Sequence, residues 1–302
     1  MLVNFFTAFF IGVTAIGALP AHVPRAGTTK LTATQVAAFK PYALLSQAGY
    51  CPASKTATWS CGASCAALPG MVIYASGGNG VATPFWFVGY YPALHSVVIS
   101  NQGTDPSKFI SLLIDADFRL DQLNSTLFPG LPSSVKTHNG FQGAQERGAE
   151  AKLIAVKRAI AEHGTSLVTL TGHSLGGAIS LIDALYLSIH LPSAKIKVVT
   201  HGMPRVGNRE FAALIDSEVP DVSRINNAKD LVPIVPGRGL GFQHVSGEKH
   251  IVSPGNWFAC NGWDNTDAKC SVGAVSNIFR GDLEDHGGHY DGISIGSAAC
   301  RN

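Results

Sequence analysis

One segment near the middle of the chain has the residue types and spacing of a serine nucleophile. Residues 172–176 match the pattern G-x-S-x-G and lie between two apolar segments. The motif requires this context, because a strand that turns directly into a helix presents the serine hydroxyl at the edge of a sheet. Gly172 and Gly176 would remove collisions at the turn, and the helix N-terminus would favour developing negative charge. The motif predicts Ser174 as a nucleophile for acyl transfer and His173 as a structural residue.

A serine hydroxyl is a weak nucleophile at neutral pH, so it needs a histidine to accept its proton and a carboxylate to orient that histidine. On a strand–serine–helix turn, the acid and then the histidine follow the serine in the sequence. Asp230 fits this order because it lies on the loop after a predicted strand over residues 222–226, although a turn-forming role would also explain it. His286 and His289 share a glycine-containing segment near the C-terminus, and their spacing does not choose between them.

These residues must be positioned by the elements around them. Short β-branched runs alternate with longer helical patterns, which predicts an α/β fold with a mostly parallel central sheet flanked by helices. Reactive groups in such a sheet gather at the carboxyl ends of the strands. A hairpin is predicted around Gly247, which favours structural roles for His244 and His250. The predicted strands cover residues 96–100, 166–171, 195–200 and 222–226, and the predicted helices cover 148–163 and 175–191.

Composition excludes several classes of protein. The chain has 302 residues, with 22 Lys and Arg against 20 Asp and Glu, so its net charge is +2. Charged residues make up 14% of the sequence, against about 25% in an average globular protein. Such sparse charge lacks the basic surface that binds phosphate backbones, so no nucleic acid partner is expected. The 46% apolar content excludes disorder, and because no linker or repeat divides residues 22–302, we expect a single domain.

The N-terminus has the pattern of a secretory signal. Residues 5–19 form an uncharged apolar run that is followed by Pro20 and Ala21. We therefore expect residues 1–21 to be a signal peptide and the mature protein to be secreted. A membrane anchor is the alternative, and the lack of flanking Lys or Arg argues against it. No other stretch of the sequence is long and apolar enough to span, so no integral membrane segment is expected after signal removal.

Six cysteines form an even set, which favours disulfides in an oxidising compartment. Their grouping suggests two local pairs, Cys61 with Cys65 and Cys260 with Cys270, and leaves Cys51 to join Cys300. A zinc site is the alternative, but no second Cys or His pair has the right spacing beside Cys61 and Cys65, so no metal is expected. Residues 124–126 form a glycosylation sequon at Asn124, which is consistent with secretion.

The serine motif is one of several sequence motifs that occur along the chain in the same order as in one known family. Together they resemble the class 3 lipases of fungi, which are secreted single-domain α/β hydrolases that act on triacylglycerols. The resemblance covers nearly the whole mature chain and implies the α/β-hydrolase fold. It is carried by Gln102-Gly103-Thr104, His138-Asn139-Gly140-Phe141, Gly172-His173-Ser174-Leu175-Gly176-Gly177, Gly202-Met203-Pro204-Arg205-Val206-Gly207-Asn208, Asn227-Ala228-Lys229-Asp230-Leu231-Val232-Pro233 and Asp285-His286-Gly287-Gly288-His289-Tyr290.

The resemblance also implies roles for particular residues. It places the acid at Asp230 and the histidine at His286 in preference to His289. It marks Thr104 as an oxyanion-hole residue that acts together with the backbone N–H of Leu175. Two donors poised where the carbonyl oxygen becomes negative would stabilise the transition state of ester hydrolysis.

The segment after Thr104 is crowded with apolar side chains. In the resembling family this position is the lid, a short helix that covers the nucleophile in water and turns its apolar face towards a lipid surface. A core helix is the alternative interpretation of the same pattern. The lid residues on this interpretation are Phe109, Ile110, Leu112 and Leu113.

Taken together, these features predict a secreted serine carboxylic ester hydrolase, a triacylglycerol lipase that forms an acyl-enzyme on Ser174. A feruloyl-type esterase on the same fold is the nearest alternative, although a more polar lid would be expected of it. A non-catalytic lipid-binding relative is a third possibility, whose signature would be the loss of a triad member. The chemistry needs no cofactor. The expected partners are an ester or lipid substrate and a transient lipid–water interface, and we expect a monomer.

Overall fold

The computed structural model describes residues 27–104 and 119–300. Its central nine-stranded sheet has the order β1-β13-β12-β10-β8-β7-β4-β3-β2, and a smaller sheet has the order β11-β9-β6-β5. The strands from β4 to β12 in the large sheet are parallel to one another, and antiparallel strands flank them. The strands are β1 (Thr28–Lys30), β2 (Val72–Gly77), β3 (Trp86–Tyr91), β4 (Ser96–Asn101), β5 (Leu120–Gln122), β6 (Lys136–His138), β7 (Leu167–His173), β8 (Lys195–His201), β9 (Gly207–Asn208), β10 (Asp221–Asn227), β11 (Phe242–Gln243), β12 (Glu248–Ser253) and β13 (Asn256–Cys260).

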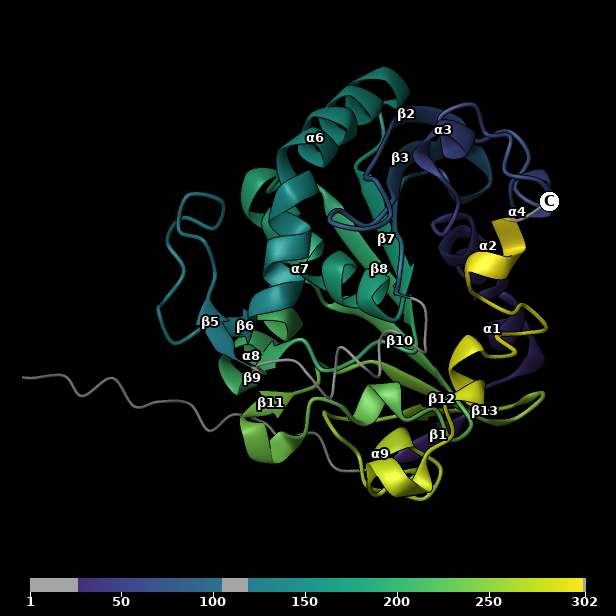
Figure 1. The fold of residues 1–302 in the computed structure, drawn as a ribbon, viewed down its shortest axis with the longest axis vertical. Helices are drawn as coiled ribbons and strands as arrows, with labels where there is room; N and C mark the ends of the chain where they lie inside the picture. Colours follow the sequence, from purple (N-terminus) through teal and green to yellow (C-terminus); the bar gives the residue numbers. More distant parts are fainter. Residues whose placement is uncertain (1–26, 105–118, 301–302) are drawn as a thin grey trace, which may run out of the picture.

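Helices cover both faces of the large sheet. Figure 1 shows α6 and α7 on one side of it and α1 and α2 on the other. The two hydrophobic cores follow from the alternation of side chains along each strand. Val97 and Ile99 of β4 belong to the core beneath α6 and α7, whereas Val98 belongs to the core beneath α2. The helices are α1 (Ala33–Ala37), α2 (Lys40–Ala48), α3 (Ala53–Thr56), α4 (Ala63–Ala66), α6 (Asn139–His163), α7 (Leu175–His190), α8 (Arg209–Glu218) and α9 (Ser271–Ala274).

Two expectations about local structure were wrong. Helix α6 begins at Asn139, nine positions before the predicted start at Gly148. The His138 side chain accepts a hydrogen bond from the Gly140 N–H at 3.0 Å and so caps the helix, and this cap offsets the glycines of the first turns. The hairpin predicted around Gly247 does not form, because β12 pairs with β10 and β13.

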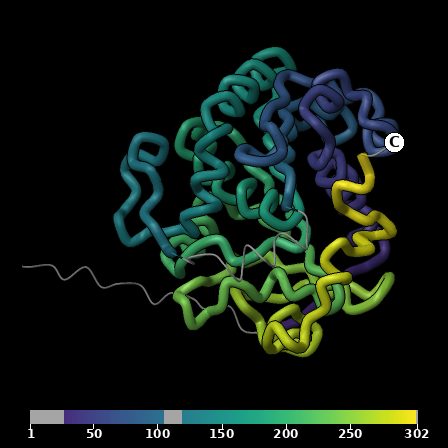
Figure 2. Tube along the Cα trace, in the orientation of Figure 1, coloured from purple at the N-terminus to yellow at the C-terminus, as the bar shows by residue number. Residues whose placement is uncertain are grey.

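The C-terminal segment returns to the N-terminal helices of the described chain. Figure 2 shows the C-terminal segment running along the N-terminal helices, and Cys51 and Cys300 form a disulfide between them. The local disulfides join Cys61 to Cys65 and Cys260 to Cys270. These are the pairings that the cysteine spacing predicted. None of the helices in the described ranges is both long and apolar enough to cross a membrane.

Candidate active site

The serine motif forms a tight turn at the carboxyl end of a central strand. Ser174 lies between β7 and α7, and its φ of 57° and ψ of −129° place it in the strained left-handed half of backbone space. A Cβ on Gly172 would lie 2.3 Å from the Gly176 carbonyl oxygen, and a Cβ on Gly176 would lie 2.1 Å from the Asn101 carbonyl oxygen. Both glycines are therefore sterically required, as the motif predicted. The Ser174 hydroxyl is buried and makes no hydrogen bond within the described part of the chain.

Asp230 and His286 come together at the same edge of the sheet. Asp230 follows β10, His286 lies in a 3-10 helix over Glu284–Gly287, and both are buried. The His286 Nδ1 lies 2.9 Å from Asp230 Oδ2, and Asp230 Oδ1 accepts the Val232 N–H at 2.9 Å. The donated Nδ1–H fixes the imidazole tautomer in which Nε2 carries the lone pair. His289, the other histidine that spacing left open, is exposed.

His173 connects the serine turn to the histidine loop. Its Nε2 lies 2.7 Å from the His286 carbonyl oxygen, and a carbonyl can only accept, so Nε2 carries the proton. Its Nδ1 then accepts the Tyr50 hydroxyl at 2.6 Å. Burial lowers the pKa of His173 well below its usual value, with a second contribution from neighbouring His286, so the ring stays neutral. The Tyr290 hydroxyl donates to the same His286 carbonyl at 3.1 Å.

Gly202, at the end of β8, packs directly against the histidine and aspartate. Its φ is +54°, and a Cβ there would lie 2.9 Å from both Asp230 Oδ2 and His286 Nδ1. The preceding residue, His201, accepts the Ser174 N–H on its carbonyl oxygen at 2.9 Å. One strand end therefore contacts the serine turn and the histidine–aspartate pair. The sequence gives no signal for a role of Gly202 or Tyr50 in the site, because their contacts arise only from tertiary packing.

The loop after β4 brings Thr104 to the same place. Thr104, Gly103, Leu175 and Tyr50 line one pocket of about 360 Å³. Gly103 fits there only without a side chain, because its Cβ would lie 2.2 Å from the Tyr50 hydroxyl oxygen. Leu175 is the first residue of α7, where backbone N–H groups lack intrahelical acceptors. The structure thus brings the two predicted oxyanion-hole residues to one pocket.

Some predicted features lie outside the described residues. They are the lid residues Phe109, Ile110, Leu112 and Leu113 and the signal peptide at 1–21. Within the described ranges, one group of potential metal ligands, Glu248 with Cys260 and Cys270, comes close together, and its two sulfurs form a disulfide.

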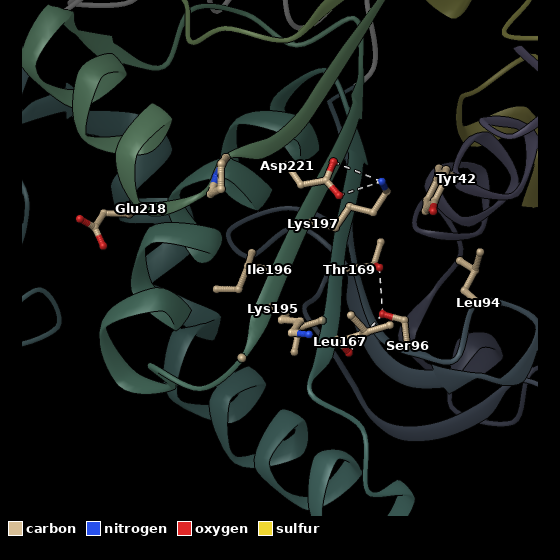
Figure 3. Close-up of a pocket in the computed structure, with 13 residues that line it drawn as sticks. Tyr42, Leu94, Ser96, Leu167, Thr169, Lys195, Ile196, Lys197, Glu218 and Asp221 are labelled. Carbon is tan, nitrogen blue, oxygen red and sulfur yellow. Dashed lines mark hydrogen bonds and ion pairs between the residues drawn. The ribbon is translucent and has the colours of Figure 1, made fainter. Parts of the chain in front are cut away.

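A larger hollow lies at the opposite edge of the sheet. Figure 3 shows it at the starts of the parallel strands, where residues such as Leu167 and Ile196 line it. Its volume is about 600 Å³. Its polar lining includes the ion pair between Lys197 and Asp221 at 3.0 Å and the hydrogen bond between the Ser96 and Thr169 hydroxyls at 2.9 Å. Because active sites of parallel sheets lie at the carboxyl ends of the strands, this hollow is not part of the serine site.

Comparison with known proteins agrees with this geometry. A protein-family model described as Lipase (class 3) matches residues 98–240. The chain is 31% identical over 221 residues to the secreted mono- and diacylglycerol lipase LIP1 of Malassezia globosa, covering 73% of this chain and 71% of that protein. The chain belongs to the class 3 lipase family. This class 3 lipase is also 34% identical over 205 residues to the secreted mono- and diacylglycerol lipase MDL2 of the same organism, covering 67% of this chain and 66% of that protein.

A solved structure supports the same assignment. The triacylglyceride lipase of Rhizomucor miehei superposes on the class 3 lipase with a TM-score of 0.77 at 25% identity, covering 90% of this chain and 99% of that one. The predicted α/β-hydrolase fold and serine hydrolase class are confirmed. Both Malassezia relatives are named as secreted proteins, which agrees with the predicted secretion.

Proposed function

We propose that the class 3 lipase hydrolyses acylglycerol esters through a catalytic triad of Ser174, His286 and Asp230. The observation that carries this proposal is the buried hydrogen bond of 2.9 Å between His286 Nδ1 and Asp230 Oδ2, beside the strained serine turn. His286 is held by Asp230 on one side and by His173 on its backbone carbonyl. Such a fixed imidazole is what a general base for a serine requires.

The reaction follows from these positions. Ser174 Oγ attacks the ester carbonyl carbon while His286 Nε2 takes its proton, which gives a tetrahedral intermediate. Thr104 and the Leu175 N–H stabilise the oxyanion. The imidazolium then protonates the leaving alcohol as the carbon–oxygen bond breaks, and an acyl-enzyme remains on Ser174. Water then attacks the acyl carbon while His286 Nε2 takes its proton. The bond between the acyl carbon and Ser174 Oγ breaks, the imidazolium returns the proton to Oγ, and the fatty acid is released.

The substrate class rests on two kinds of support. The relatives at 31% and 34% identity are named mono- and diacylglycerol lipases, whereas the sequence motifs resemble those of lipases that act on triacylglycerols. We favour partial glycerides, because those two relatives are more similar in sequence than the solved triacylglyceride lipase at 25% identity. Initial rates on emulsified monoolein, diolein and triolein test this preference. A higher rate on triolein than on diolein would contradict it, and a higher rate on methyl ferulate than on any glyceride would favour the feruloyl-type esterase.

The chemistry is tested separately from the substrate class. Ser174→Ala is expected to abolish hydrolysis of p-nitrophenyl butyrate and labelling by a fluorophosphonate. Ser188→Ala is the matched control, because the Ser188 hydroxyl lies on the same helix and bonds only to the Leu185 carbonyl in the described chain, at 2.9 Å. This control is expected to keep full activity. Turnover that survives in Ser174→Ala would overturn the proposal, and labelling of the protein by the fluorophosphonate at another residue would do the same.

The organisation of the chain follows the same proposal. A signal peptide over residues 1–21 would be removed on secretion, and residues 22–302 would act as one monomeric domain whose lid carries Phe109, Ile110, Leu112 and Leu113. The apolar lid side chains support an interfacial mode of action, in which a lipid surface draws the lid away. Activity that does not rise when a short-chain ester passes its solubility limit would contradict this mode.

A further inference from the structure

A buried polar cluster lies at the base of the loop that carries Thr104. Lys152 of α6 forms an ion pair with Asp183 of α7, and their side chains are only 3% and 2% exposed. Lys152 Nζ also donates to Asn101 Oδ1 at 3.2 Å, while Asn101 Nδ2 donates to Asp183 Oδ2 at 3.0 Å. The amide of Asn101 therefore has its oxygen on the cation and its nitrogen on the anion, which allows one orientation of the side chain.

Asn101 lies against both glycines of the serine motif. It is the last residue of β4 and is paired in register with Gly172 on β7. Its carbonyl oxygen occupies the space that a side chain on Gly176, in the first turn of α7, would need. Thr104 follows three residues later. A shift of Asn101 would thus move the loop of Thr104 relative to the N-terminus of α7.

We propose that Asn101, held by the Lys152–Asp183 ion pair, is a positioning residue that sets the distance between the oxyanion donors of Thr104 and Leu175. The inference rests on the proposed function of those two residues. Asn101, Lys152 and Asp183 do not line the pocket that Thr104 and Leu175 share. They therefore act through the backbone and do not touch substrate.

Stability alone gives no reason for these residues. Burial lowers the pKa of Lys152, and Asp183 opposes this effect, so the charges are held against a cost of desolvation. Replacing a buried ion pair by apolar side chains of similar volume is often neutral or stabilising. A leucine in place of Asn101 would make no hydrogen bonds, so it would not fix the orientation of the backbone at this position. An oxyanion hole needs a fixed orientation, because its donors act only when they are aimed at the developing charge.

The test measures Asn101→Leu with p-nitrophenyl butyrate and with phenylboronic acid, which forms a tetrahedral adduct on a catalytic serine. We expect kcat to fall about 10- to 100-fold with KM nearly unchanged, because a misplaced donor weakens only the transition state. The inhibition constant of the boronic acid should rise by a similar factor. Asp216→Asn is the matched control. The Asp216 carboxylate accepts from the Ser246 and Trp263 side chains and lines a separate hollow beside Pro220 and Gly247, so kcat should be unchanged.

A double-mutant cycle separates positioning from a merely structural role. If Asn101 acts through the oxyanion loop, Asn101→Leu should lower kcat by a much smaller factor in the Thr104→Val variant than in the wild type. The proposal would be overturned if the loss of kcat in the double variant equals the product of the losses in the two single variants. A folded Asn101→Leu protein with wild-type kcat would overturn it as well. If Asn101→Leu does not fold, the nearly isosteric Asp183→Asn replaces it, and wild-type kcat and boronic acid inhibition in that variant would overturn it equally. Turnover in Ser174→Ala would instead show that the proposed function itself is wrong.

Discussion

Replacing Gly202 by alanine tests how closely the histidine–aspartate pair is packed. The new Cβ would lie 2.9 Å from Asp230 Oδ2 and from His286 Nδ1, against 3.4 Å for an ordinary contact, so the pair must move by about half an ångström. A misplacement of about 1 Å in an active site can cost about 100-fold in rate, so half of it should cost about 10-fold in kcat. The φ of +54° adds a second effect, because a side chain in this region destabilises the fold by about 1 to 2 kcal/mol.

Gly164 provides the control that separates the two effects. It caps α6 with a φ of +60°, and a Cβ there would meet nothing within 4 Å. Gly164→Ala should therefore lose about the same stability, about 1 to 2 kcal/mol in urea unfolding, and keep wild-type kcat. Both variants are assayed for kcat and KM on p-nitrophenyl butyrate. The reasoning is refuted if Gly202→Ala keeps wild-type kcat, or if Gly164→Ala loses as much kcat as Gly202→Ala does.

Three further predictions follow from other contacts. Asp230→Asn should lower kcat by about 10⁴-fold with little change in KM, because an amide no longer fixes the tautomer of His286; a loss below 10-fold on a soluble ester would contradict the proposed triad. Burial lowers the pKa of His201 to about 3, so the unfolded state binds the extra proton below about pH 6.5 and stability falls as the pH falls from there to about 3. When the pH falls from 6.5 to 4.5, the free energy of unfolding of His201→Gln, measured in urea, should therefore drop by about 2 to 3 kcal/mol less than that of the wild type. Parallel curves of unfolding free energy against pH for the two proteins would refute this. Replacing both Cys51 and Cys300 by alanine should lower the free energy of unfolding by about 2 to 5 kcal/mol, because their bond closes almost the whole described chain into a loop; an unchanged urea midpoint would count against it.

The parts of the site that depend on local geometry could be predicted from the sequence. The G-x-S-x-G turn is such a feature in part, because the collision that Gly172 avoids is with Gly176, within a few residues of Ser174. The collision that Gly176 avoids is with Asn101 on the neighbouring strand. Asp230 could be placed as well, since the carboxyl ends of parallel strands meet at one edge. The choice between His286 and His289 could not be made from spacing, because it depends on which ring reaches Asp230 across the fold.

Other features required the tertiary structure. The start of α6 was missed because glycines in its first turns oppose a helix by propensity, whereas the His138 cap and packing favour it. The prediction of a hairpin around Gly247 was wrong because residues 248–253 pair with β10 and β13 and not with the residues just before Gly247. The role of Tyr50 had no signal at all in the sequence, since it meets His173 across 123 positions.

The chain has few charged residues, and some of them form buried ion pairs. Two of the buried ion pairs in the described residues hold loops near the active edge of the sheet. Asn101 is oriented by one ion pair, and Arg205 forms another with Asp264 at 2.7 Å. Arg205 also donates to the Pro236 carbonyl at 2.8 Å and so anchors the segment after Asp230. Because a buried pair adds little net stability over apolar packing, apolar replacements at these pairs should impair turnover more than they impair folding.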